Sequence, residues 1–213
     1  MSEHALYDPR CTRCGRLAGF LEQVRARHPD YWARPVPSFG VDDPRILIVG
    51  LAPGLHGANR TGRPFTGDYA GILLYETLHA AGLANRAHSE SREDALRLRE
   101  TRIVNSVKCV PPQNKPTPAE IRTCNGYLRA ELGKLARVRV VLALGRIAHE
   151  AFLRASELKP AAFPFGHGRE HALAAGRTLL DSYHCSRYNT STRRLTAEMF
   201  ARVVARACEL AGV

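Results

Sequence analysis

Short apolar runs alternate along the chain with longer segments of helical periodicity. Four short segments predict strands: two are continuous apolar runs typical of buried strands, and a third alternates apolar and polar positions. These predicted strands are residues 45–51, 102–108, 138–145 and 178–184. Apolar positions three and four apart predict helices over residues 11–27, 69–83, 118–136, 146–156 and 194–211. The charged segment 86–100 is expected on the surface, as helix or loop.

The order of these elements is one helix followed by four strand–helix repeats. This order predicts an α/β fold in a single domain over residues 1–213, with three α/β/α layers and a four-stranded parallel central sheet. Ligands bind such sheets beyond the carboxyl ends of the strands. The loops expected at that edge are residues 50–68, 105–116 and 184–192.

Composition is that of an ordinary globular protein with a strong basic excess. The 213 residues are 45% hydrophobic, and 31 Lys and Arg stand against 20 Asp and Glu, a net charge of +11. This excess favours a polyanionic partner, although a basic enzyme without one is equally compatible with it. We find no apolar run of the ~18–20 residues that a membrane span needs and no signal-peptide pattern, so we expect a cytoplasmic protein without a membrane partner.

Six cysteines in a chain expected in the cytoplasm indicate metal or cluster ligation rather than disulfides. Cys11 and Cys14 form a C-x2-C knuckle, and Cys109 and Cys124 could complete a four-thiolate site. Spacing does not distinguish zinc from a 4Fe–4S cluster, since both accept four thiolates. Cys109 and Cys124 could instead be buried apolar fillers.

Residues 50–68, GLAPGLHGANRTGRPFTGD, form a glycine-rich loop after the first predicted strand. The loop matches neither a P-loop nor G-x-G-x-x-G, so it is not a nucleotide-phosphate motif of either kind. Phe65 would be an exposed aromatic here unless a flat ligand stacks on it. Asp68 opens the next helix, where it could cap the helix or act as a base or cation stabiliser.

Three motifs together resemble the uracil-DNA glycosylase superfamily, and within it the family 5 (type b) enzymes. They are Gly50-Leu51-Ala52-Pro53-Gly54 with Arg60-Thr61-Gly62-Arg63-Pro64-Phe65-Thr66-Gly67-Asp68, the segment Asn105-Ser-Val-Lys-Cys109-Val-Pro-Pro, and Ser182-Tyr-His-Cys-Ser-Arg-Tyr-Asn189-Thr. The resemblance runs from Cys11 to about Leu195. It implies a 4Fe–4S cluster on Cys11, Cys14, Cys109 and Cys124.

The resemblance implies that a nucleotide flips out of DNA into a pocket formed by these loops. Its implied base-binding residues are Gly50, Leu51, Ala52, Gly54, Phe65, Asn105 and His184. Phe65 would stack on the base, and Asn105 would pair with the base edge. Asn114 is an alternative for that role, or a turn residue. His184 would donate to the base as it leaves as an anion.

Asp68 would complete a catalytic set with Asn105 and His184, because Leu51 cannot polarise water. Asp68 would orient that water or stabilise the sugar cation. The implied DNA contacts are Arg187, Tyr188, Asn189, Arg193 and Arg194. Two departures from the family pattern, Cys185 in place of proline and Arg193-Arg194-Leu195 in place of Gly-Arg-Leu, concern the loop that would touch DNA.

The expected function is therefore excision of uracil, and of other deaminated bases such as hypoxanthine, from single- or double-stranded DNA by a monomeric repair glycosylase. The main alternative is a superfamily member that binds uracil-containing DNA without turnover and does not need Asp68. An electron-transfer protein would use the cluster but would explain none of the Phe65, Asn105 and His184 pattern. A zinc-stabilised nuclease would need a carboxylate cluster that the sequence lacks.

Overall fold

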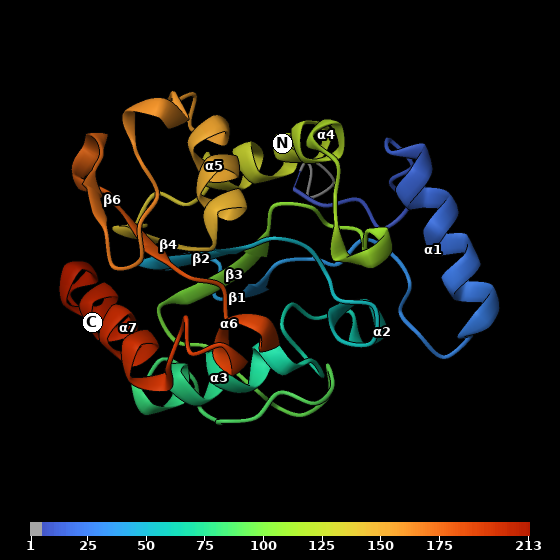
Figure 1. Ribbon diagram of the computed structural model, residues 1–213, viewed down its shortest axis with the longest axis horizontal. Helices are drawn as coiled ribbons and strands as arrows, with labels where there is room; N and C mark the ends of the chain where they lie inside the picture. Colours follow the sequence, from blue (N-terminus) through green and yellow to red (C-terminus); the bar gives the residue numbers. More distant parts are fainter. Residues whose placement is uncertain (1–5) are drawn as a thin grey trace.

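A twisted six-stranded sheet organises the computed structural model, which describes residues 6–213 (Figure 1). The strands are β1 (Phe39–Gly40), β2 (Ile46–Gly50), β3 (Thr101–Asn105), β4 (Val140–Leu144), β5 (Glu170–Ala172) and β6 (Thr178–Ser182). The helices are α1 (Gly15–Arg27), α2 (Ala58–Thr61), α3 (Tyr69–Ala80), α4 (Pro118–Leu132), α5 (Arg146–Ala155), α6 (Arg187–Ser191) and α7 (Ala197–Ala211), with three short 3-10 turns between them.

The sheet order is β1-β3-β2-β4-β6-β5, and its four central strands are parallel. These are the four strands predicted from the sequence, so the α/β class is confirmed. The predicted total of four strands is wrong, because β1 and β5 add an antiparallel strand at each edge. The edge strands have two and three residues and are at most partly buried, so they carry no apolar pattern that a sequence could reveal.

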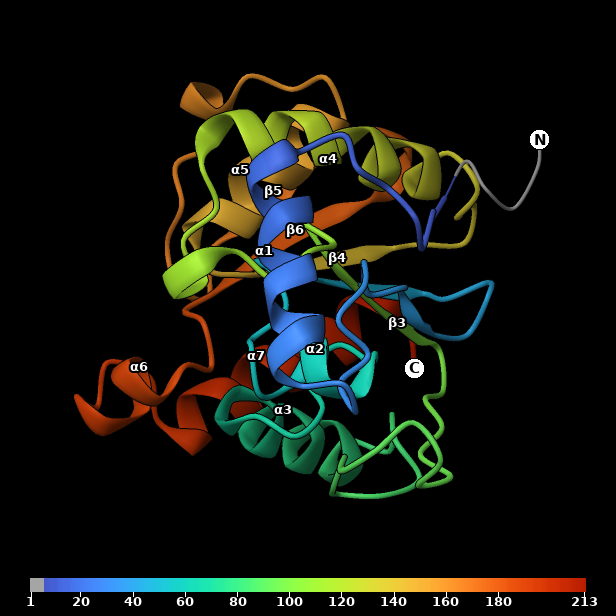
Figure 2. The ribbon, with the colours of Figure 1, turned by 90° about the vertical axis from the view of Figure 1, so that its right-hand side faces the viewer.

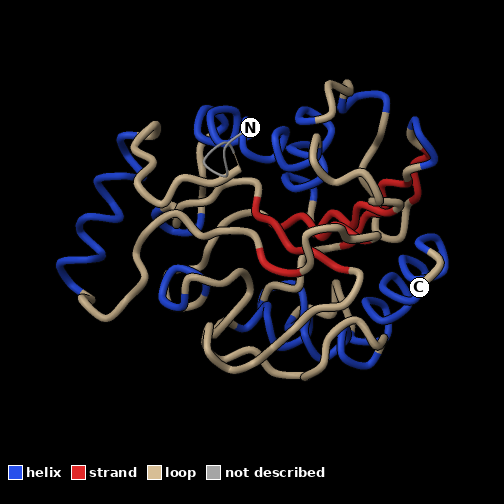
Figure 3. Tube along the Cα trace, turned by 180° about the vertical axis from the view of Figure 1, so that it is seen from behind, coloured by secondary structure: helices blue, strands red, loops and turns tan. Residues whose placement is uncertain are grey.

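Helices cover both faces of the sheet, as the predicted three layers require (Figures 1 and 3). On β2, Leu47 and Val49 pack with residues of α1, α4 and α5, whereas Ile46 and Ile48 pack with residues of α3 and α7. Both faces of the strand are thus buried, which explains its continuous apolar run. No helix in the described part of the chain has the length and hydropathy to cross a membrane.

Local capping sets where the helices begin. Thr117 and Glu120 form the predicted capping box at the start of α4. The last helix starts at Ala197 rather than at the predicted residue 194, because the Thr196 side chain accepts a hydrogen bond from Met199 N and caps it. The segment 86–100 is loop, with one isolated bridge between Ala84 and Leu98.

Candidate active site and cysteine cavity

A pocket of about 410 Å³ opens where the loops after β2, β3 and β6 meet. Figure 2 looks toward this end of the molecule, with α6 standing out at one side. The pocket brings together residues from all three predicted motifs. Its lining residues are Leu51, Ala52, Gly54, Ala58, Phe65, Asp68, Tyr69, Ala70, Asn105, Asn114, His184, Ser186 and Arg187.

Phe65 and Asn105 line the pocket, whereas Gly50, a predicted base-binding residue, does not line it but lies next to both of these side chains. Gly50 and Asn105 are register partners at the ends of β2 and β3. A Cβ atom on Gly50 would lie 2.4 Å from Asn105 Oδ1 and 2.7 Å from Phe65 Cζ, so only glycine fits there. Asn105 Oδ1 is buried and has no hydrogen-bond partner. Since an unpartnered buried acceptor is costly, this oxygen is placed to receive a donor from a ligand.

Phe65 is held with a backbone φ of 53°, in the left-handed region that an aromatic residue rarely adopts. The residue is 6% exposed and packs into the core beside α3, so it is not the exposed aromatic that its polar loop suggested. Its ring lies 5.9 Å from the His184 ring, centroid to centroid. The two rings therefore border the same space.

His184 is neutral at physiological pH. Burial disfavours the charged imidazolium and lowers the pKa of His184 from 6.5 to about 4. The carbonyl oxygen of His184 accepts a hydrogen bond from Asn189 Nδ2 at 2.8 Å, which ties the His184 backbone to α6. A neutral imidazole retains one N–H donor, which can stabilise an anion without itself being an acid.

Asp68 caps α3 and lines the pocket at the same time. Its Oδ1 accepts a hydrogen bond from Gly71 N at 2.9 Å, so the expected capping role is met. Its Oδ2 would lie 2.5 Å from a Cβ on Gly57, so Gly57 leaves the space that this carboxylate fills. Burial raises the pKa of Asp68, opposed by the backbone N–H groups of Gly71 and Ala70. Capping and catalysis are therefore not exclusive roles for this residue.

The loop after β6 carries the predicted DNA contacts on the short helix α6. Tyr188 is 71% exposed, and Arg187 lies over the Tyr69 ring at the rim of the pocket. Arg194 instead stacks on Tyr183, 4.5 Å from the ring centroid. Asn189, whose amide nitrogen bonds His184, has a role within the loop. Contacts of these residues with DNA stay predictions.

Asn114 also reaches the pocket, although the sequence left its role open. It follows Gln113 in a turn in which both residues have left-handed φ values, 57° and 56°. Such backbone conformations in non-glycine residues cluster at functional sites. Their signal in the sequence was only the proline-rich context.

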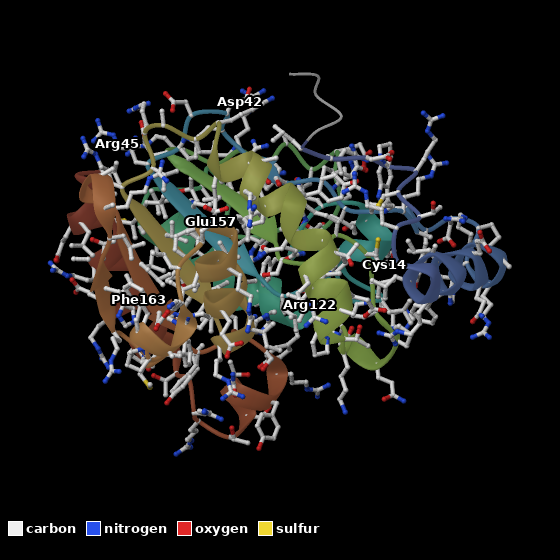
Figure 4. All side chains as sticks on the ribbon, turned by 90° about the horizontal axis from the view of Figure 1, so that it is seen from above. Cys14, Asp42, Arg45, Arg122, Glu157 and Phe163 are labelled. Carbon is white, nitrogen blue, oxygen red and sulfur yellow. The ribbon has the colours of Figure 1, made fainter. Side chains whose placement is uncertain are left out.

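The four predicted ligand cysteines meet in a single cavity between α1 and α4. Cys11, Cys14, Cys109 and Cys124 line it together with Leu17, Val107, Tyr127 and four other residues. Figure 4 shows Cys14 between these two helices. Burial raises the pKa values of the Cys14, Cys109 and Cys124 thiols, and the proximity of the other cysteines adds to the shift for Cys14 and Cys109. Lys108 N donates a hydrogen bond to Cys124 Sγ at 3.3 Å.

The spacing of the sulfurs is wider than a zinc site requires. In a tetrahedral site with Zn–S bonds of about 2.3 Å, the sulfurs lie ~3.8 Å apart. Across residues 6–213, the only metal-ligating group with atoms all within 4.8 Å of one another is His149, His171 and Asp181. No three of the four sulfurs approach so closely. Cys185 and Cys208 do not line the cavity.

The group around Asp181 is a charged hydrogen-bonded network that sequence analysis missed. His149 Nδ1 lies 2.7 Å from Asp181 Oδ1, and His149 Nε2 lies 2.8 Å from the Phe163 carbonyl oxygen. Both ring nitrogens face an acceptor oxygen, an arrangement that favours the doubly protonated imidazolium. Burial opposes this charge, but the bond to Asp181 prevails and the pKa of His149 is raised. Two ligands of one zinc ion lie about 3.3 Å apart, so the 2.7 Å contact is that of a hydrogen bond rather than of two zinc ligands.

Comparison with known proteins places the chain in a family. A model described as the Uracil DNA glycosylase superfamily matches residues 37–208, and the chain belongs to this superfamily. A type-5 uracil-DNA glycosylase of Thermus thermophilus is 51% identical over 95% of this chain and 94% of its own length. A type-5 uracil-DNA glycosylase of Mycobacterium tuberculosis is 45% identical over 95% and 79%.

A type-4 uracil-DNA glycosylase of Thermotoga maritima is 38% identical, over only 52% of this chain and 50% of its own length. The similarity to type-5 enzymes thus extends over nearly the whole chain, whereas the similarity to this type-4 enzyme covers half. The resemblance to family 5 that the motifs indicated is confirmed.

Proposed function

We propose that this chain is a DNA-repair glycosylase that hydrolyses the N-glycosidic bond of uracil in DNA. The observation that carries the proposal is the unpartnered Oδ1 of Asn105, which lies against Phe65 in the pocket that His184 also lines. Uracil is flat and carries an N–H group between two carbonyl oxygens. Asn105 Oδ1 would accept that N–H and its amide nitrogen would donate to a carbonyl, while Phe65 would stack on the ring.

Cleavage breaks the bond between the sugar carbon C1′ and the base nitrogen, and the electron pair leaves with the base. Charge then collects on the base carbonyl oxygens, where the neutral His184 would donate its N–H. Because the pKa of His184 is about 4, this residue stabilises the anion by a hydrogen bond rather than by transferring a proton.

The sugar is left as an oxocarbenium-like cation that water attacks at C1′. The carboxylate of Asp68 at the pocket wall would stabilise the cation, orient the water and accept its proton. The raised pKa of Asp68 favours that acceptance. Leu51 also lines the pocket, but its hydrocarbon side chain can neither orient the water nor accept its proton.

The four-cysteine cavity supports a 4Fe–4S cluster, since its thiols converge without the close approach that zinc would need. When bound, the cluster would supply four iron–thiolate bonds. Cys11 and Cys14 precede α1, Cys109 follows β3, and Cys124 lies in α4. These thiolates would therefore fasten the N-terminal segment to the segment that carries Asn105.

Arg187, Arg193 and Arg194 would contact the phosphates of single- or double-stranded DNA, with Asn189 beside them, and Tyr188 would fill the gap left by the flipped base. The same pocket would admit other deaminated bases such as hypoxanthine, because Gly54 and Ala58 in its lining are small. We propose that the protein acts as a monomer.

The test is excision by the purified chain from labelled single- and double-stranded oligonucleotides that carry uracil or hypoxanthine. Alkali-labile abasic sites should appear with uracil and be absent with thymine in the same position. Tight binding of uracil-containing DNA without abasic product would favour the non-catalytic alternative. Asp68→Ala then separates the two functions, since it should abolish turnover but spare binding.

A further inference from the structure

Arg63 is a buried arginine within the first motif, 4% exposed, and does not line the pocket. Its guanidinium forms a two-pronged ion pair with Asp94, with Nη1 2.8 Å from Oδ1 and Nη2 bonded to Oδ2. Nη2 also donates to Ser89 Oγ at 2.7 Å, and Nε donates to Thr66 Oγ1 at 2.9 Å. The side chain thus links the first motif to the loop over residues 86–97.

Asp94 organises that loop as well as neutralising Arg63. It accepts backbone N–H groups of Glu90 at 2.8 Å, Ser91 at 3.2 Å and Leu96 at 3.0 Å. Burial opposes ionisation of Asp94, yet these bonds and Arg63 hold its pKa well below the usual range. The loop is therefore a rigid element built around one carboxylate, although no residue of 86–97 lines the base pocket.

Phe65 lies between two backbone segments that hydrogen bonds hold in place, Arg63–Pro64 before it and Thr66–Gly67 after it. The Arg63–Thr66 bond spans it, Tyr75 OH donates to the Pro64 carbonyl oxygen at 2.7 Å, and Gly67 N donates to the Ser89 carbonyl oxygen at 3.1 Å. With a φ of 53°, Phe65 has a backbone conformation that persists only when its surroundings determine it. The hydrogen bonds on both sides of Phe65 hold its backbone in this conformation.

We propose that Arg63 and Asp94 are positioning residues that hold Phe65 in the orientation needed to stack on the flipped base. The proposal rests on the proposed function, because stacking by Phe65 is part of it. Loss of one partner would leave a buried charge unpaired and release the strained turn. The loop 86–97, outside the pocket, thereby contributes to base capture.

The first experiment compares Asp94→Asn with Glu93→Gln in single-turnover excision of uracil with excess enzyme. Glu93 is the exposed neighbour in the same loop, so the control makes the same charge change without touching Arg63. Stacking is worth roughly 5- to 150-fold in affinity, so Asp94→Asn should raise the half-saturating enzyme concentration about tenfold. Its maximal rate should change far less, and Glu93→Gln should match the wild type.

A double-mutant cycle with Phe65→Ala distinguishes positioning from a general loss of stability. If Asp94 acts through Phe65, then Asp94→Asn should add little to the defect of Phe65→Ala. Multiplicative defects would overturn the proposal. Ser89→Ala provides a second cycle if Asp94→Asn fails to fold, because it removes the bonds of Ser89 Oγ to Arg63 and Thr66 without leaving a charge unpaired. Its smaller capture defect should likewise vanish in the Phe65→Ala background, and a persistent defect would overturn the proposal.

The outcomes separate this inference from the proposed function. A wild-type chain that does not excise uracil refutes the function. A wild-type chain that excises uracil, with Phe65→Ala equally effective in capture, refutes stacking and the positioning proposal but leaves excision intact.

Discussion

Asn105, which lines the base pocket, and Cys109, which lines the cysteine cavity, are only four residues apart in the chain. The two sites nevertheless differ in how their polar atoms are satisfied. The pocket keeps a buried oxygen of Asn105 without a partner and an imidazole, His184, in its neutral form. The cavity gathers thiols from distant parts of the chain among apolar side chains. The base pocket thus presents a free hydrogen-bond acceptor to a molecule that enters it, whereas the cysteine cavity encloses the four sulfur atoms that would bind a cluster.

Under the proposed function, the difference follows from how long each ligand stays: the base is transient and the cluster is permanent. A group that binds a transient ligand must remain unsatisfied in the free protein, which costs stability. A permanent cluster repays the burial of its thiolates at all times, so its site can be closed. We therefore expect changes in the pocket to affect rate and base choice while sparing the fold, and changes in the cavity to affect the fold first.

The largest effect is expected from Cys124→Ser. Loss of one thiolate should abolish cluster retention and sharply reduce folded yield. Cluster retention is measured by iron analysis of anaerobically purified protein. It is also measured by the broad absorption at about 400 nm that is expected of thiolate-ligated Fe–S clusters. Cys208→Ser, outside the cavity, should leave iron content unchanged. Colourless wild-type protein with one zinc per chain would refute the iron assignment.

His184→Ala should lower the single-turnover rate by about 100- to 1000-fold, or ~2.7–4 kcal/mol, with little change in DNA affinity or melting temperature. The reason is that, in the proposed mechanism, its hydrogen bond strengthens only as the base becomes an anion. The penalty should shrink for 5-fluorouracil, which is already a better leaving anion. Equal penalties for both bases would make His184 a packing residue and Asn105 the next candidate.

Asn105→Ala should act on capture and on rate together, because in the proposed mechanism Asn105 pairs with the base before cleavage. Removal of hydrogen bonds to a buried partner costs ~1–3 kcal/mol, about 5- to 150-fold. The loss should differ between uracil and hypoxanthine, whose edges differ. A uniform loss across bases, measured by single-turnover titration, would contradict recognition of the base edge by Asn105.

The contribution of His184 to the excision rate should depend little on pH near neutrality. With a pKa of about 4, His184 stays neutral above about pH 5, so its contribution to the rate should be constant from pH 5 to 8 and change only near pH 4, where the ring gains a second N–H and a positive charge. The unfolded chain binds this proton near pH 6.5, so the stability gained from a neutral His184 should also decline as pH falls from 6.5 to 4. The ratio of wild-type to His184→Ala rates across pH isolates this group. A ratio that already changes near pH 6.5 would contradict the lowered pKa.

The smallest effect should come from neutralising Arg187, Arg193 or Arg194 one at a time. Each phosphate contact on duplex DNA contributes a slope of about −0.9 in log affinity against log salt. Each substitution to Gln should therefore reduce the slope by about one unit without changing base preference. The exposed Arg146, on α5, gives a matched control. A salt-independent wild-type affinity would remove these arginines from the interface.

The sequence by itself determined the four central strands of the sheet and the identity of the candidate site residues. Continuous apolar runs predicted β2 and β4 as strands buried on both faces, and the segments 102–108 and 178–184 predicted β3 and β6. The motifs identified Phe65, Asp68, Asn105 and His184, and parallel strands necessarily bring their following loops to one edge. The loops after β2, β3 and β6 do meet there.

Only the tertiary structure decided the properties that depend on distant neighbours. The edge strands β1 and β5 are set by pairing with β3 and β6, and two or three residues leave no pattern of their own. The lowered pKa of His184 and the free oxygen of Asn105 follow from burial beside segments far away in sequence. The pairing of Arg63 with Asp94, 31 positions apart, has no local signal either. Burial and long-range pairing are properties of the packed chain, and periodicity reports only on which face a residue occupies.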